Sequence, residues 1–176
     1  MKMKKIYKKK FLNKLIILAV LLLAPITSSA EIGDKKWTKE CAKDNKKSCV
    51  IAIESQAAIP DSDKKQTLAT AIIQLATTVE ENKLVPVLTV RFPLNVDLKK
   101  QPLIQIDKKN VLNIPFTHCN ANEGCVTRIA INDEVIKLFK SGKELTLITG
   151  VYGSKDNMKI NLKLKGFSKA YDSLLK

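Results

Sequence analysis

Apolar and polar residues alternate along much of the chain, with the two-residue period of strands that bury one face. The clearest stretch is NMKINLKLKGF, residues 157–167, where the lysines fall on one face and the apolar residues on the other. A second stretch, VPVLTVRFP at residues 85–93, places Leu88, Val90 and Phe92 on one face. Both stretches therefore predict half-buried β-strands with polar side chains toward water.

Several of these strands are separated by short polar turns and should pair as hairpins. Residues 103–107 and 110–116 flank the turn DKKN, and residues 144–165 contain two strands around a Gly-Ser-Lys-Asp-Asn reversal. Residues 37–42 and 48–53 form a further predicted pair. The sequence thus predicts an antiparallel arrangement of neighbouring strands.

Helical signals are few. Asn132 can cap the segment DEVIKLFKSG, which has acids in its first turn and lysines in its last, and Gly142 ends it. The segment FSKAYDSLLK has apolar residues at helical spacing and predicts a short amphipathic helix at residues 167–176. Residues 66–79 combine alanine and leucine with threonine and isoleucine, which leaves helix and strand both open; we favour a strand.

Many short strands and few helices predict a mainly β protein, an antiparallel β-sandwich or a partly closed barrel with a short internal helix and a C-terminal helix. No Gly/Ser-rich linker and no internal repeat divides residues 31–176, so we expect a single domain there. Trp37 is predicted to pack in the core beside a disulfide, on the same strand face as Cys41.

The first 30 residues have a different organisation. Lysines crowd the first 14 residues, a ten-residue apolar run follows at residues 15–24, and small residues precede Glu31. A membrane-spanning helix needs about 20 apolar residues, so this order indicates a secretory signal peptide at residues 1–30. We expect cleavage between Ala30 and Glu31 and export of the remaining chain.

Removal of the signal peptide changes the charge balance. Seven lysines and no acidic residue lie in residues 1–30, so the formal charge of +14 for the whole chain falls to +7 for residues 31–176. A lysine-rich surface is typical of a soluble exported protein and also allows peripheral association with an anionic outer-membrane surface. Sparse aromatic residues and the predicted export argue against a nucleic-acid partner.

The chain has four cysteines: Cys41, Cys49, Cys119 and Cys125. An oxidising compartment and an even count favour disulfides, for which three pairings exist. The spacing favours Cys41 with Cys49 and Cys119 with Cys125, because each pair brackets a polar, turn-forming segment. Neither spacing fits a zinc site or a thioredoxin-like C-x-x-C pair.

The stretch FTHCNANEGCV, residues 116–126, is the main candidate for chemistry. His118 adjoins Cys119 and could activate its thiolate, but an oxidised pair has no thiolate, and an edge-strand histidine is the simpler interpretation. The sequence contains no G-x-S-x-G, S-x-x-K, H-E-x-x-H or P-loop motif. We therefore expect no catalytic residue, metal or cofactor, although paired carboxylates assembled by the fold would leave a hydrolase open.

Six segments follow one another in order along nearly all of residues 31–176: WTKEC, SCVIAIES, RFPLNVDLKKQPLIQID, NIPFTHCNANEGCVTRI, LFKSGKELTL and LKLKGFSKAYDSL. In this order the chain resembles the invasion-associated locus B (IalB) family of exported bacterial proteins. The paired cysteines, the framing by Pro93 and Asp107 and the terminal Gly166-Phe167 helix are specific in combination. The lysine richness and the segment 66–79 depart from the family pattern without touching the cysteines.

The resemblance implies an immunoglobulin-like β-sandwich with the four cysteines in a structural role. It also implies a location in the periplasm of a Gram-negative bacterium, at its outer membrane or outside the cell. The family is linked to host-cell invasion and virulence, and it supplies no catalytic residues. We therefore expect a non-catalytic binding module for a protein or envelope polymer. The alternatives are an envelope-maintenance or stress protein with no host role and, third, a hydrolase or thiol enzyme.

Overall fold

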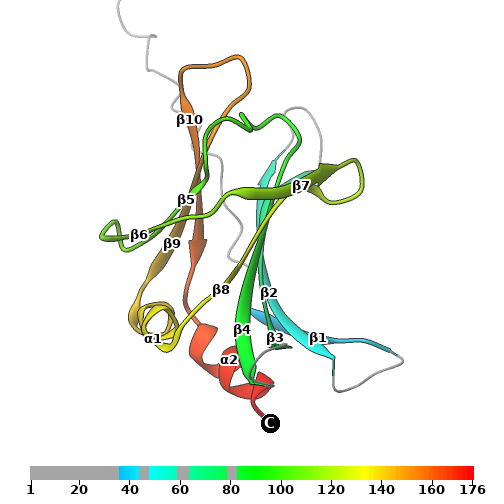
Figure 1. Cartoon of the computed structure of the whole chain (residues 1–176), viewed down its shortest axis with the longest axis vertical. Helices are drawn as coiled ribbons and strands as arrows, with labels where there is room; N and C mark the ends of the chain where they lie inside the picture. Colours follow the sequence, from blue (N-terminus) through cyan, green and yellow to red (C-terminus); the bar gives the residue numbers. More distant parts are fainter. Residues whose placement is uncertain (1–35, 44–47, 59–63, 79–82) are drawn as a thin grey trace, which may run out of the picture. The chain divides into compact units, whose positions relative to one another are not determined.

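In the part of the chain that the structure describes, ten strands form two antiparallel sheets, with two helices at one end (Figure 1). The elements of this computed structural model are β1 (Thr38–Cys41), β2 (Cys49–Ala58), β3 (Lys65–Thr77), β4 (Leu84–Phe92), β5 (Leu103–Ile106), β6 (Asn110–Asn113), β7 (Phe116–Asn120), β8 (Gly124–Ala130), α1 (Asp133–Ser141), β9 (Glu144–Gly150), β10 (Asn157–Lys163) and α2 (Phe167–Leu174). The structure describes residues 36–43, 48–58, 64–78 and 83–176. The predicted signal peptide and its cleavage site between Ala30 and Glu31 lie outside these residues.

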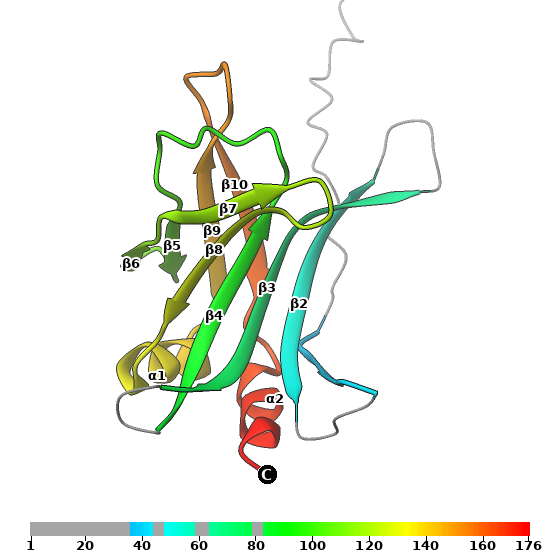
Figure 2. The same cartoon turned by 45° about the vertical axis from the view of Figure 1, so that its right-hand side comes forward.

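The larger sheet has the order β1-β2-β3-β4-β8-β7, and the smaller sheet has the order β10-β9-β5-β6. Every pair within the sheets is antiparallel. Figure 2 shows the two sheets facing each other, with α1 and α2 beside the ends of β3, β4 and β8. The predicted mainly β sandwich with a short internal helix, a C-terminal helix and two local disulfides is confirmed.

The two sheets bury their facing apolar side chains between them, as the alternating pattern predicts. Leu88, Val90 and Phe92 of β4 are at most 2% exposed, and Ile160 and Leu162 of β10 are equally buried. Lys159, Asn161 and Lys163, which alternate with these residues on β10, are exposed. Burial stabilises the fold by about 1.5–3 kcal/mol for each such side chain. These buried side chains occupy the positions that the period-two pattern predicts.

The segment whose sequence left helix and strand open is β3, a 13-residue strand. Ala69, Ala71 and Ile73 are buried, while Thr70 and Ile72 between them are only partly buried. This alternation has the period of a strand, and β3 pairs with β2 on one side and β4 on the other. Tertiary pairing therefore overrides the helix propensity of alanine and leucine, and the favoured strand assignment is confirmed.

Both helices form where the sequence predicts them. Asn132 caps α1, because its side-chain oxygen accepts a hydrogen bond of 3.0 Å from the backbone N–H of Val135. Phe167 of α2 is fully buried against three other rings, those of Trp37, Phe139 and Tyr171, at centroid distances of 5.0–5.7 Å. This aromatic cluster attaches α2 to α1 and to the start of the larger sheet.

Trp37 lies in the core, as expected, at 6% exposure. Its ring packs edge-to-face on Phe167, and its indole N–H donates to the backbone oxygen of Lys163 at 3.1 Å. Cys41, which the sequence placed on the same strand face as Trp37, is by contrast exposed on β1. The aromatic partner of Trp37 is thus a helix residue 130 positions away in the chain, which the strand pattern could not indicate.

The two disulfides hold the two edge strands of the larger sheet. Cys41 and Cys49 are direct cross-strand partners of β1 and β2, and Cys119 and Cys125 are direct partners of β7 and β8. The Cα atoms of each pair are 4.0 Å apart. Because β1 and β7 are the outermost strands, each bridge fixes a strand that has a neighbour in the sheet on one side only.

Candidate functional site

The stretch FTHCNANEGCV forms the β7–β8 hairpin, whose closing residues, 120–124, we call the stapled loop. Cys119 and Cys125 bridge the strands immediately outside the loop. Within it, the side-chain oxygen of Asn120 accepts hydrogen bonds from the backbone N–H groups of Asn122 at 2.9 Å and Glu123 at 2.8 Å. An Asn side chain that bonds forward in this way replaces backbone turn contacts and fixes the reversal.

Gly124 completes the loop with a backbone conformation that other residues avoid. Its φ is +75°, and an added Cβ would lie 2.1 Å from the backbone oxygen of Phe92. The left-handed conformation alone disfavours a side chain here, and the close approach of β4 excludes one without movement of the backbone. The loop is therefore held by a bridge, an Asn turn and an obligatory glycine within seven residues.

The carboxylate of Glu123 is the centre of a polar network on this loop. It lies 3.1 Å from each of three nitrogens: His118 Nε2, Asn120 Nδ2 and Arg91 Nη2. Hydrogen bonds from His118 and Asn120, followed by the charge of Arg91, lower the pKa of Glu123 below its ordinary value of 4.5. The carboxylate is thus ionised at neutral pH and accepts from His118, which places the ring proton on Nε2.

A cleft of about 280 Å³ lies beside the stapled loop, between β3 and the end of β4. Arg91, Asn122 and Glu123 line it. Arg91 gives one N–H to Glu123, and its Nε is buried without a partner among the described residues. A guanidinium has five N–H donors, so the terminal nitrogens of Arg91 retain capacity for an acceptor in the cleft.

The loop geometry also decides what His118 and its neighbouring cysteine can do chemically. All four cysteines are in disulfides, so Cys119 offers no thiolate for His118 to activate. His118 lies on edge strand β7, as predicted, but its imidazole is bonded to Glu123 rather than isolated. Among the described residues, no group of three or more His, Cys, Asp or Glu side chains could hold a metal ion.

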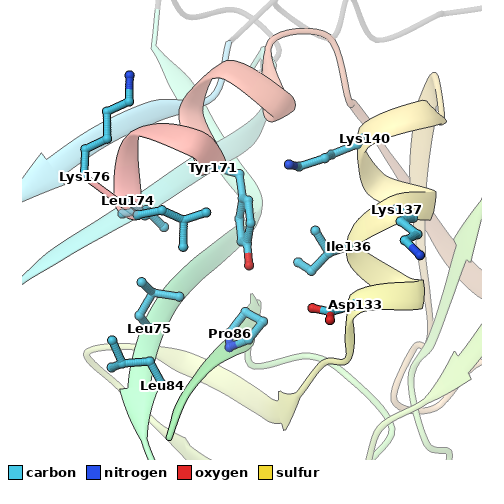
Figure 3. A pocket seen from close by; sticks show the side chains of 11 residues that line it. Leu75, Leu84, Pro86, Asp133, Ile136, Lys137, Lys140, Tyr171, Leu174 and Lys176 are labelled. Carbon is cyan, nitrogen blue, oxygen red and sulfur yellow. The ribbon is translucent and has the colours of Figure 1, made fainter.

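A second concave site lies between α1, α2 and the adjoining ends of β3 and β4; we call it the helix-end groove (Figure 3). Its volume is about 530 Å³, within the usual range for small-molecule sites of about 300–1,000 Å³. Its apolar lining comes from four elements and from the residue after α2: Leu75, Leu84, Pro86, Ile136, Leu174 and Leu175. The groove therefore depends on the packing of distant segments.

Tyr171 stands in the helix-end groove with its hydroxyl toward Pro86 and Asp133 (Figure 3). Burial and, second, the carboxylate of Asp133 raise the pKa of the Tyr171 phenol, which stays neutral near pH 7. Lys140 bonds Asp172 at 2.7 Å, and its ammonium lies 5.1 Å from the centroid of the Tyr171 ring. The aromatic wall is thus held between helices by packing and one ion pair.

Two further lysines, Lys137 and Lys176, line the helix-end groove and point outward at its rim (Figure 3). Within the described part of the chain, neither has an ion-pair partner. Three lysines line the groove against one carboxylate, Asp133. The lining thus combines an apolar floor with a positively charged rim.

The sequence and the structure agree on the cysteines and differ in the residues around them. The structure pairs Cys41 with Cys49 and Cys119 with Cys125, the arrangement that the spacing favoured. Sequence reasoning missed Glu123 and Arg91 as functional candidates, since they meet only through the pairing of β4 with β8. It treated residues 167–176 as a helix with one apolar face but did not indicate the groove that this face helps to line.

The fold and the two bridges define a disulfide-stapled antiparallel β-sandwich, a class of protein that fits an extracytoplasmic, oxidising compartment. The described residues include no helix that is both long and apolar enough to cross a membrane. Residues 37–175 match the family described as Invasion associated locus B (IalB) protein, and the chain belongs to that family.

A solved structure gives the same architecture. The chain is similar to the crystal structure of invasion associated protein B from Bartonella henselae, with a TM-score of 0.59 and 19% sequence identity. The alignment covers 79% of this chain and 91% of the Bartonella chain. At this identity the likeness establishes the fold alone. A comparison with curated proteins found no match.

Proposed function

We propose that this protein is an exported, non-catalytic interaction module of the bacterial envelope, located in the periplasm or at the outer membrane. Membership of the invasion-associated locus B family suggests an invasion-associated envelope protein, and the two disulfides fit export. The single observation that carries the binding role is the rigidity of the stapled loop. Its partner is an acceptor-rich protein or envelope polymer that contacts the loop and the cleft beside it.

Rigidity matters because a preformed loop loses little conformational entropy when it binds. The stapled loop has its shape before any partner arrives, since Asn120, Gly124 and the Cys119–Cys125 bridge each fix it independently. Asn122, which the Asn120 turn positions, is exposed and lines the cleft with Arg91. Loops held on a rigid sheet are a usual place for recognition.

Capture from envelope extracts tests the binding role directly. The mature chain, residues 31–176, is immobilised and titrated with extract, alongside Asn120→Ala, which removes the turn, and Asn161→Ala, a matched exposed asparagine on β10. We expect saturable capture by wild type and Asn161→Ala, and binding about tenfold weaker for Asn120→Ala. Absence of any saturable partner, or equal capture by all three proteins, would contradict the proposal.

The non-catalytic half of the proposal has a separate test. Thiol titration and intact mass spectrometry of the folded protein should find two intact bridges and no thiol that reacts without denaturant. A reactive thiol or a stoichiometric bound metal in the purified protein would instead support the thiol-enzyme or metal-dependent alternatives. Peptide mapping should assign the bridges to Cys41–Cys49 and Cys119–Cys125.

A further inference from the structure

Apolar side chains are unusually exposed at the helix-end groove. Leu84 and Leu175, both of which line it, are 61% and 62% exposed, and they are two of the five large apolar residues most open to water in the described part of the chain. We propose that the helix-end groove binds a free single-chain carboxylate amphiphile, such as a fatty acid, with the acyl chain on the apolar floor and the carboxylate at the lysine rim.

The floor of the groove suits an acyl chain. Leucine, isoleucine and proline side chains from β3, β4, α1 and the end of α2 supply its apolar lining. Each buried CH₂ group of a ligand contributes about 0.8 kcal/mol when it leaves water. An acyl chain on this floor would also cover Leu84 and Leu175, whose side chains are mostly exposed.

The lysines at the rim favour a negatively charged headgroup. Lys137 and Lys176 have no ion-pair partner in the described residues, whereas Lys140 already binds Asp172. A lysine side chain can lay its methylene stem along apolar surface while its ammonium stays in water. These two ammonium groups lie on opposite sides of the groove (Figure 3), so either one can meet a carboxylate at the rim, and both would repel a cationic head.

An acyl chain fits better than a peptide segment because of hydrogen bonding. A bound peptide brings an N–H and a carbonyl at each residue, and buried groups of this kind need partners. Pro86 has no N–H to offer, and the inner residues of α1 and α2 use their backbone groups within the helices. The polar groups in the lining are mainly the Tyr171 hydroxyl and charged side chains at the rim, enough for one headgroup.

Calorimetric titration with dodecanoate below its micelle concentration is the direct test. We expect dodecanoate to bind the mature chain saturably, one to one. Dodecyltrimethylammonium, which reverses the head charge, should bind at least about tenfold more weakly than dodecanoate. Leu84→Asp, in the floor, and Lys137→Glu, at the rim, should each weaken dodecanoate binding about tenfold, equivalent to about 1.4 kcal/mol.

Matched controls separate the groove from the rest of the surface. Leu98 is 60% exposed, almost the same as Leu84, but lies beyond the other end of β4, so Leu98→Asp should bind dodecanoate like wild type. Lys109→Glu, on the β5–β6 turn, is the charge-matched control for Lys137→Glu. Circular dichroism should show every variant folded before binding is compared.

Several outcomes would overturn the proposal. These are no saturable binding to the folded wild type, equal affinity for the cationic amphiphile, equal loss in the control variants, or binding only to anionic lipid vesicles and not to free dodecanoate. The last result would indicate a membrane surface instead. The groove and the stapled loop lie at opposite ends of β4, because Leu84 begins that strand and Phe92 at its end pairs with Cys125. Groove variants should therefore leave capture through the stapled loop unchanged.

Discussion

The stapled loop and the helix-end groove are built in opposite ways. Residues 118–125 supply nearly everything that shapes the loop: a bridge, an Asn turn, a glycine and most of the Glu123 network. The groove draws its walls from segments that span residues 75–176. Covalent and hydrogen-bonded contacts fix the first site, whereas apolar packing fixes the second. Local contacts are therefore expected to protect the loop when the groove is damaged.

The largest effect should come from the aromatic cluster behind the groove. Phe167→Ala removes a fully buried ring in contact with Trp37, Phe139 and Tyr171, and such truncations cost about 3–5 kcal/mol. Urea unfolding followed by Trp37 fluorescence measures this loss. Leu175→Ala, at an exposed position, should change stability by less than about 0.5 kcal/mol. Equal costs for the two variants would show that the groove does not depend on this cluster.

The next effect tests the close approach of β4 at the loop. Gly124→Ala places a Cβ 2.1 Å from the Phe92 oxygen at φ +75°, and conformational strain plus overpacking should cost about 2–4 kcal/mol. Gly153 is the matched control, because its φ is +74° but an added Cβ would meet nothing within 4 Å. Gly153→Ala should cost only about 1–2 kcal/mol, the conformational part. Equal unfolding midpoints for the two variants would contradict the role of β4 packing.

Removal of the bridge should have a smaller effect. Cys119→Ser combined with Cys125→Ser frees a loop of about seven residues, for which chain entropy predicts a loss of about 2 kcal/mol. Denaturant unfolding gives the value, and the Asn turn should keep the loop shape in the folded state. If the double variant kept its fold and stability but lost partner capture entirely, a purely structural role for the bridge would be wrong.

The smallest effect concerns the charge of Glu123. It separates the contributions of His118 and Arg91 to the pKa of this carboxyl. Its lowered pKa means that its stabilising contribution is present above its unfolded value of 4.5 and is lost as pH falls through the folded value. NMR titration should give the Glu123 carboxyl a pKa below 4.5. His118→Ala should raise this pKa more than Arg91→Ala, because the hydrogen bond from His118 is the larger cause. The reverse order would mean that charge, rather than hydrogen bonding, dominates the network.

Much of the fold could be predicted because its signals are periodic or local. Alternation located β4 and β10, and the cap at Asn132 located α1. The strand β3 was harder to predict, because composition alone does not show that β2 and β4 pair with it on its two sides. The candidate sites divide in the same way: the bridged hairpin was predicted, whereas Arg91 meets Glu123 across 32 residues of sequence and was not.

The sequence by itself determined which faces are buried and where the helices begin, and it favoured one pairing of the cysteines, since each depends on residues within about ten positions of one another. Only the tertiary structure decided that both bridges hold edge strands of one sheet and that α1 and α2 form a groove with β3 and β4. The physical reason is that a period of two shows which face of a strand is buried but not which strands lie beside it. Apolar packing between distant segments selects those neighbouring strands.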